Sequence, residues 1–197
     1  MITTGVLVFD GAEELDFVGP WEVFAMAAKL RERGDQVTLI AEHDRPVRCA
    51  KGMRVVPDVT FDAIDALDVV LVPGGIGTRR EVTNPALMRW LRAIAPKCTW
   101  VTSVCTGALL LHEAGMAKGK RVTTHWSFVE QLRARGDVTV LDDVRFVRDG
   151  NLVTAAGVSA GIDLALWLVG QLDEPAFARR VQRQIEYDPA PPYAAET

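Results

Sequence analysis

The chain has 197 residues, of which 49% are hydrophobic and 24% are charged, an ordinary composition for a folded domain with a sizeable core. Its formal net charge of −4 gives no basic excess for binding a phosphate backbone, so we expect no nucleic-acid partner. No uninterrupted apolar run approaches the roughly 20 residues of a membrane-spanning helix, so we expect no membrane partner either.

The N-terminus and the cysteines indicate the cellular compartment. Residues 1–5 carry no positively charged stretch ahead of the first apolar run, so we expect no signal peptide. The three cysteines, Cys49, Cys98 and Cys105, are odd in number and form no CxxC pair. This argues against a disulfide framework or a zinc site and predicts a reducing, cytoplasmic environment.

The first half of the chain alternates between strand and helix patterns. We expect a buried strand at 5–9, a helix at 21–33, a strand at 36–41, a hairpin or two short strands at 48–56 and a buried strand at 68–72. Pro20 in the first turn and Gly34 at the stop support the limits of the helix.

The second half continues the alternation. We expect a helix at 85–94, a buried strand at 99–104, a helix at 107–116, strands at 145–147 and 152–155, a buried helix at 160–172 and an amphipathic helix at 177–187. Asp149, Gly150 and Asn151 are typical of a hairpin turn between the two late strands.

Short, fully apolar strands between helices are typical of a parallel sheet that is covered on both faces. The sequence contains no internal repeat, and its one linker-like stretch, 188–192, lies near the C-terminal end. We therefore expect a single α/β domain over residues 1–197.

Cys105 stands where the strand at 99–104 gives way to the next helix. A cysteine at such a turn resembles a nucleophile elbow, and the helix N-terminus behind it favours the thiolate. Cysteines placed this way have pKa values of roughly 3.5–7.5. The small residues around it, Ser103, Thr106 and Gly107, favour a nucleophile, although buried structural cysteines are common.

Two loops at the same edge of the sheet could serve this cysteine. The loop Gly74–Gly77 reads either as a tight turn or as an oxyanion site formed by the N–H groups of Gly75 and Ile76. Asp16 lies among apolar residues after the first strand, where burial beside a thiolate would raise its pKa and let it donate a proton. Glu13 and Glu14 are competitors for this role, and any of the three acids could instead cap a helix or face solvent.

The histidines give weaker signals. His125 could partner the cysteine, but a structural role is the commoner fate of such a residue. His43 and His112 form no ligand cluster with other residues, so we expect no metal.

Four motifs in order resemble the DJ-1/PfpI superfamily, which has a flavodoxin-like, class I glutamine amidotransferase-like fold. They read FDGAEELDFVGPWEVF, DVVLVPGGIG, VTSVCTGALLLHEAGMAKGKRVTTHW and LVTAAGVSAGIDLAL, and the resemblance extends to the QRQIEYDPAPPY segment near the C-terminus. Within the superfamily the motifs are most similar to the isocyanide hydratases, also called cyclohexyl-isocyanide hydratases.

The resemblance implies roles for individual residues. Cys105 would be the nucleophile, Asp16 the acidic partner, and Gly75 and Ile76 the oxyanion loop. Thr106 follows the nucleophile as it does in the hydratases, whereas the proteases of the superfamily have histidine there. The resemblance also implies a homodimer that acts on a small molecule.

The implied reaction needs no cofactor. The Cys105 thiolate would attack the terminal carbon of an isocyanide while Asp16 supplies a proton, and water would release an N-substituted formamide from the thioimidate. Two alternatives stay open. One is a glyoxalase- or deglycase-like enzyme acting on 2-oxoaldehydes. The other is a ligand or redox sensor related to AraC-type regulators, although we find no helix-turn-helix region in this sequence.

Overall fold

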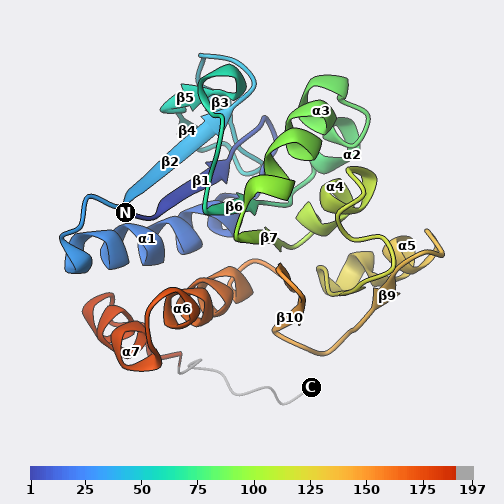
Figure 1. The fold of residues 1–197 in the computed structure, drawn as a ribbon. Coiled ribbons are helices and arrows are strands. Elements are labelled where there is room, and N and C mark those ends of the chain that lie inside the picture. The colour runs from blue at the N-terminus through green and yellow to red at the C-terminus, as the bar shows by residue number, and fades with distance from the viewer. Residues whose placement is uncertain (190–197) are drawn as a thin grey trace.

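The computed structural model describes residues 1–189 and has a mostly parallel sheet at its centre (Figure 1). In the described residues the order of strands in this sheet is β10-β11-β7-β6-β1-β2-β5, with β10 and β11 antiparallel to each other. The strands are β1 (Thr3–Leu7), β2 (Gln36–Ala41), β5 (Val59–Thr60), β6 (Val69–Val72), β7 (Trp100–Val104), β10 (Phe146–Asp149) and β11 (Leu152–Ala155). Two small pairs lie outside it, the antiparallel β3 (Val47–Arg48) with β4 (Arg54–Val55) and the parallel β8 (Arg121–Val122) with β9 (Thr139–Val140).

Helices cover both faces of the sheet (Figure 1). One face carries α1 (Glu14–Arg31), α6 (Ala160–Leu172) and α7 (Pro175–Gln184), and the other carries α2 (Thr78–Glu81), α3 (Pro85–Ile94) and α4 (Gly107–Glu113). A short helix, α5 (Val129–Arg133), lies beyond the sheet near β9. This arrangement confirms the predicted α/β, flavodoxin-like fold class.

The core explains why the central strands are apolar without alternation. All four residues of β6 are fully buried because helices cover both of its faces. The helix α3 adds Leu87, Leu91 and Ile94 from one side, as the helical spacing predicts. Burying one such side chain stabilises the fold by about 1.5–3 kcal/mol, so this layer fixes the strands whose ends carry the candidate site.

The predicted start of the first helix is wrong. α1 begins at Glu14 rather than Trp21, so Pro20 lies inside the helix. Proline there removes one backbone hydrogen bond, but its ring packs close to Gly161 of α6, where a side chain would leave no room. The helix ends in a left-handed residue at Glu32 rather than at Gly34.

Smaller differences concern helix ends and short elements. The helix after Cys105 stops at Glu113, and the last helix spans 175–184 rather than 177–187. The elements α2, α5, β5, β8 and β9 are too short to leave a periodic pattern, and the sequence did not indicate them. Of the linker-like stretch and the C-terminal motif, the part from residue 190 onward lies outside the described residues.

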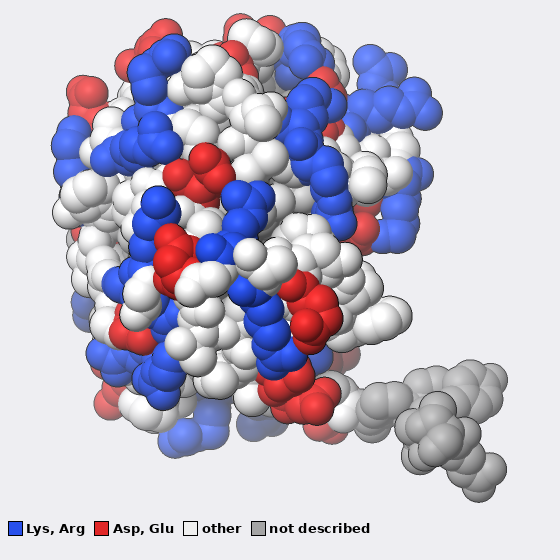
Figure 2. All heavy atoms as spheres, turned by 90° about the vertical axis from the view of Figure 1, so that its right-hand side faces the viewer, with Lys and Arg blue, Asp and Glu red and all other residues white. Residues whose placement is uncertain are grey.

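Two properties of the surface bear on partners. None of the helices within residues 1–189 combines the length and the apolar character that a membrane crossing requires. On the face drawn in Figure 2, acidic side chains lie between the basic ones rather than leaving a patch of one sign. Among the described residues, Arg133 forms ion pairs with both Glu130 and Asp142.

Candidate active site

Cys105 occupies a strained turn between β7 and α4. Its φ of 56° is in the left-handed region, which costs a residue with a side chain about 1–2 kcal/mol. The surroundings hold this conformation in place: Cys105 N–H donates to the Ala156 carbonyl at 2.7 Å, and Thr124 Oγ1 donates to the Cys105 carbonyl at 2.9 Å. Cys105 is only 7% exposed, so its thiol has little contact with solvent.

The glycine loop after β6 lies directly against this turn. A Cβ atom on Gly74 would stand 2.4 Å from the Thr106 nitrogen, so only glycine permits this approach. Gly75 has a φ of 111° and packs against the loop after β1, which glycine alone tolerates. The loop therefore brings its backbone N–H groups to the cysteine and to the nearby carboxyl group.

Asp16 lies in the first turn of α1 and is fully buried. Its Oδ2 accepts a hydrogen bond from Gly74 N–H at 2.9 Å, while Oδ1 has no nitrogen or oxygen partner in residues 1–189. Burial raises the pKa of Asp16 to about 7, and the nearby charge of Glu13 adds to the rise, although the Gly74 hydrogen bond opposes it. The sequence predicted this upward shift of the pKa.

The predicted low pKa of Cys105 is wrong. Burial raises the pKa of its thiol to about 12, and the charge of Asp16 raises it further, against smaller lowering effects from hydrogen bonds with Thr106 and Gly75. The helix behind it, α4, has only seven residues, so its dipole is weak. The resting state at neutral pH is therefore a thiol beside a carboxyl group that can be protonated or ionised.

Thr106 organises the floor of the site. Its buried hydroxyl group accepts hydrogen bonds from Gly75 N–H at 3.1 Å and from Thr78 Oγ1 at 3.1 Å. The Arg79 guanidinium donates a hydrogen bond to the Gly75 carbonyl at 3.0 Å and lies 3.4 Å from the Thr106 hydroxyl oxygen. Thr106 thus ties α2 to the nucleophile turn, and its own N–H acts on the Cys105 thiol.

The backbone N–H groups of Gly75 and Thr106 interact with the Cys105 sulfur and lower the pKa of its thiol. Ile76, the other residue expected in the oxyanion loop, is 66% exposed and is not among the largest influences on the Cys105 pKa. The structure thus brings Cys105, Asp16, Thr106 and Gly75 together and leaves Ile76 at the rim.

The competing acids have other partners. Glu14 accepts a hydrogen bond from Lys51 N–H at 2.7 Å, and Glu13 forms an ion pair with the Lys51 side chain. The turn between β3 and β4 is therefore fastened to the start of α1, close enough for Lys51 to affect the pKa of Asp16.

His125 caps a short 3-10 helix, because its Nδ1 accepts from Ser127 N–H at 3.2 Å. Its ring packs against Gly157, where an added Cβ atom would lie 2.6 Å from the ring. This geometry gives His125 a structural explanation.

Sequence reasoning placed Gly74 in the predicted glycine loop but missed several supporting residues, namely Lys51, Thr78, Arg79 and Thr124. These residues come from loops and from the short helix α2, and their meeting depends on the tertiary fold. Within residues 1–189 there is no cluster of three His, Cys, Asp or Glu side chains able to hold a metal ion.

Comparison with known proteins agrees with this arrangement. The DJ-1/PfpI family model matches residues 4–171, a span that holds the whole sheet except the first residue of β1. This chain belongs to the DJ-1/PfpI family.

Relatives within the family differ in their named functions. The chain is 41% identical over 189 residues to an isonitrile hydratase of Pseudomonas putida, covering 96% of this chain and 80% of that protein. It is 29% identical to the HTH-type transcriptional regulator CdhR of Pseudomonas aeruginosa, covering 91% of this chain but only 53% of the regulator. The crystal structure of a ThiJ/PfpI family protein from Pseudomonas syringae superposes with a TM-score of 0.90 at 33% identity, covering 100% of this chain and 79% of that one.

Proposed function

We propose that the protein hydrates an isocyanide to an N-substituted formamide, with Cys105 as nucleophile and Asp16 as proton carrier. The observation that carries the proposal is the buried pair of a thiol and a carboxyl group whose pKa is raised to about 7. Such a carboxyl group can take and return a proton near neutral pH. The similarity to the isonitrile hydratase supports this substrate class.

In the first step ionised Asp16 takes the proton of the Cys105 thiol as sulfur attacks the terminal carbon of R–N≡C. A carbon–sulfur bond forms, one carbon–nitrogen π bond is lost, and the electron pair left on that carbon takes the proton back from Asp16. The product is the thioimidate R–N=CH–S–Cys105. The N–H groups of Gly75 and Thr106 stabilise negative charge on sulfur as the proton leaves.

In the second step water adds to the thioimidate carbon and its nitrogen gains a proton. The carbon–sulfur bond then breaks, releasing R–NH–CHO and the Cys105 thiol. Asp16 passes a proton from water toward nitrogen or sulfur, so one carboxyl group serves both halves of the reaction. Atoms balance with water as the only co-reactant, and no cofactor is required.

The test is conversion of cyclohexyl isocyanide to its formamide by purified protein without added metal or nucleotide. We expect turnover by the unaltered protein, no turnover by Cys105→Ala, and unchanged turnover by Cys49→Ala, which alters another buried cysteine. Methylglyoxal is the comparison substrate. Faster formation of lactate from methylglyoxal than of formamide from the isocyanide would favour a glyoxalase function instead. Activity on neither substrate would favour a sensor function.

A further inference from the structure

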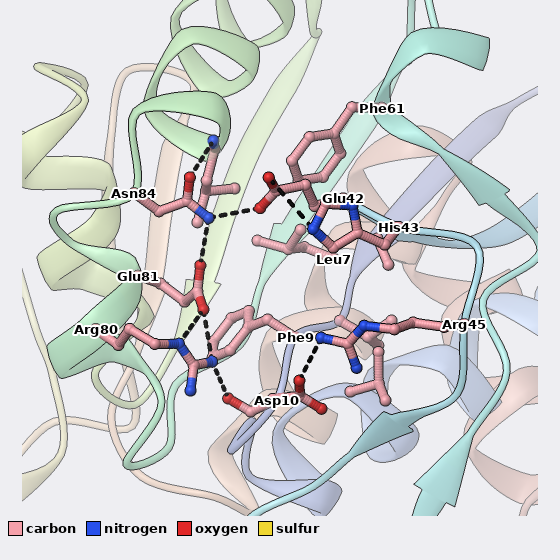
Figure 3. Close-up of a pocket in the computed structure, with 14 residues that line it drawn as sticks. Leu7, Phe9, Asp10, Glu42, His43, Arg45, Phe61, Arg80, Glu81 and Asn84 are labelled. Carbon is pink, nitrogen blue, oxygen red and sulfur yellow. Dashed lines mark hydrogen bonds and ion pairs between the residues drawn. The ribbon is translucent and has the colours of Figure 1, made fainter.

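A cavity lies at the carboxyl edge of the sheet, separate from the cysteine site (Figure 3). Its volume is about 180 Å³, many times the roughly 10–15 Å³ that one water molecule needs. It lies beyond the ends of β1 and β2 and is closed by α2 and the start of α3. Neither Cys105 nor Asp16 lines it.

Its place in the topology favours a binding site. After β1 the chain adds β2 on one side and later β6 on the other. In open α/β sheets, ligands bind outside the carboxyl ends of strands near such a change of direction. The proposed cysteine chemistry uses the β7 side of this edge and leaves the β2 side without a role.

One wall of the cavity is a fixed polar network. Asn84 Nδ2 donates to Glu42 Oε2 at 2.6 Å and to Glu81 Oε2 at 2.8 Å, while its Oδ1 caps α3 (Figure 3). Arg80 binds Glu81 Oε1 through two nitrogens, at 2.8 and 2.6 Å. Glu81 therefore has both oxygens occupied and is held nearly fully buried.

Glu42 keeps one acceptor free. Among the described residues its Oε1 has no hydrogen bond, and the His43 ring nitrogen Nε2 lies 3.6 Å away. The carboxylate is 32% exposed and points toward the cavity in Figure 3. This oxygen can accept a hydrogen bond from a ligand donor, most strongly from a cationic one.

The opposite end of the cavity carries guanidinium groups. Arg45 and Arg80 lie on either side of Asp10 in Figure 3, where Arg45 Nη2 binds the Asp10 carboxylate at 2.7 Å and Arg80 Nη2 binds its backbone carbonyl at 2.7 Å. Each guanidinium has five N–H donors, so both retain donors beyond these contacts. The donors suit a carboxylate, which Arg recognises by paired hydrogen bonds.

Between the two polar ends the cavity surface is apolar, formed mainly by Leu7, Phe9, Phe61 and Leu87. The lining holds three carboxylates, but Asp10 and Glu81 are already paired with Arg45 and Arg80. Glu42 is therefore the acceptor left for a cationic group, and the remaining guanidinium N–H groups are the donors left for an anionic one. A ligand with an ammonium group, a carboxylate and a short apolar body matches all three parts.

We propose that this cavity binds a small zwitterion of the α-amino-acid type, with its ammonium group on Glu42, its carboxylate on Arg45 and Arg80, and an apolar side chain against Leu7 and Phe61. The site is independent of the isocyanide chemistry, because it shares no side chain with the cysteine site. Asp10 nevertheless belongs to the loop that leads to Asp16, so an occupant would contact a segment of the active-site wall.

The test is calorimetric titration of the full chain with L-alanine, L-valine and L-leucine, and with two analogues that each lack one charge, L-valinamide and N-acetyl-L-valine. We expect saturable binding of at least one free amino acid and at least about tenfold weaker binding of both analogues, because each loses a charged hydrogen bond. This comparison uses the unaltered protein and needs no variant to fold.

Variants then locate the site. Glu42→Gln and Arg45→Met should each weaken binding at least about tenfold, whereas Cys105→Ala and the distant Arg33→Met should leave it unchanged. Absence of saturable binding by all three amino acids would overturn the proposal. So would equal binding of the analogues, or loss of binding in Cys105→Ala, which would place the ligand at the cysteine.

Discussion

Asp16 is a carboxyl group that the folded chain keeps out of water at a cost. Its folded-state pKa of about 7 lies above its ordinary value of 3.8, so folding favours the protonated form. The stability that Asp16 contributes is therefore complete below pH 3.8, declines as the pH rises, and is lost once the pH passes 7. The difference between these two pKa values corresponds to a loss of about 4 kcal/mol in the free energy of unfolding.

Asp16→Asn should remove this dependence. The amide carbonyl can still accept from Gly74 N–H, and it has no charge to desolvate. We expect the free energy of unfolding of the variant to exceed that of the unaltered protein above pH 7 and to approach it near pH 4. Urea unfolding of both proteins at several pH values measures these free energies. A difference between the two proteins that stays constant with pH would contradict the raised pKa of Asp16.

The same substitution should remove most activity. Asparagine cannot carry a proton between sulfur and carbon, so we expect kcat/KM for cyclohexyl isocyanide to fall roughly 10²–10⁴-fold. The exposed Asp62→Asn is the matched control and should retain full activity. Normal turnover by a folded Asp16→Asn protein would return the proton role to Glu13, Glu14 or His125.

The pH dependence of the reaction follows from the same group. If Asp16 must be ionised to accept the thiol proton, kcat/KM should rise about tenfold per pH unit below pH 7 and level off above it. A profile that falls as pH rises through 7 would instead mean that protonated Asp16 acts first on a thiolate. Initial rates between pH 5 and 9 decide between the two.

At the scale of elements, the glycine loop after β6 is the part least open to change. Gly74→Ala would push a Cβ atom into the Thr106 nitrogen, and we expect it to cost about 1–3 kcal/mol of stability and to abolish turnover by displacing the elbow. Gly170→Ala in α6 is the control, since its Cβ would make ordinary contacts at 3.5 Å or more. Melting curves and activity assays of both variants provide the measurement. Full activity of Gly74→Ala would contradict the close packing of Gly74 against the Thr106 nitrogen.

Long elements with a strong pattern were predictable from the sequence. The helices at Pro85–Ile94 and Ala160–Leu172 have the expected limits, and the hairpin of β10 and β11 has its expected turn. The start of α1 was not predictable, because proline usually marks a first turn and here tertiary packing holds it inside a helix. Elements of two to five residues depend on contacts that no local period records.

The candidate site also has features that could be predicted from the sequence and features that could not. Cys105, Asp16 and Gly75 could be located because strand ends in a parallel sheet meet at one edge. The contacts of Thr78, Arg79 and Lys51 could not be predicted, because they join segments that are distant in sequence. The thiol pKa was misjudged because sequence shows the helix behind the cysteine but not the depth of its burial.

At the scale of the whole molecule, we propose the homodimer that the family resemblance implies. Trp126 is 81% exposed, so burying its large apolar side chain in a dimer interface would stabilise the association. Light scattering should give twice the 21.6 kDa of one chain. Trp126→Ser should weaken association if this surface is buried in the dimer, and a monomer at high concentration would contradict the proposal.

The left-handed backbone at Cys105 means that the protein would be more robust without its reactive residue. Glycine adopts a φ of 56° without penalty, so Cys105→Gly should unfold at a higher denaturant concentration than Cys105→Ala, by about 1 kcal/mol. Selection for stability alone would therefore tend to replace Cys105 with glycine. The presence of Cys105 in this strained turn at the sheet edge indicates that stability is given up for reactivity, so a laboratory selection for heat tolerance should recover glycine at this position.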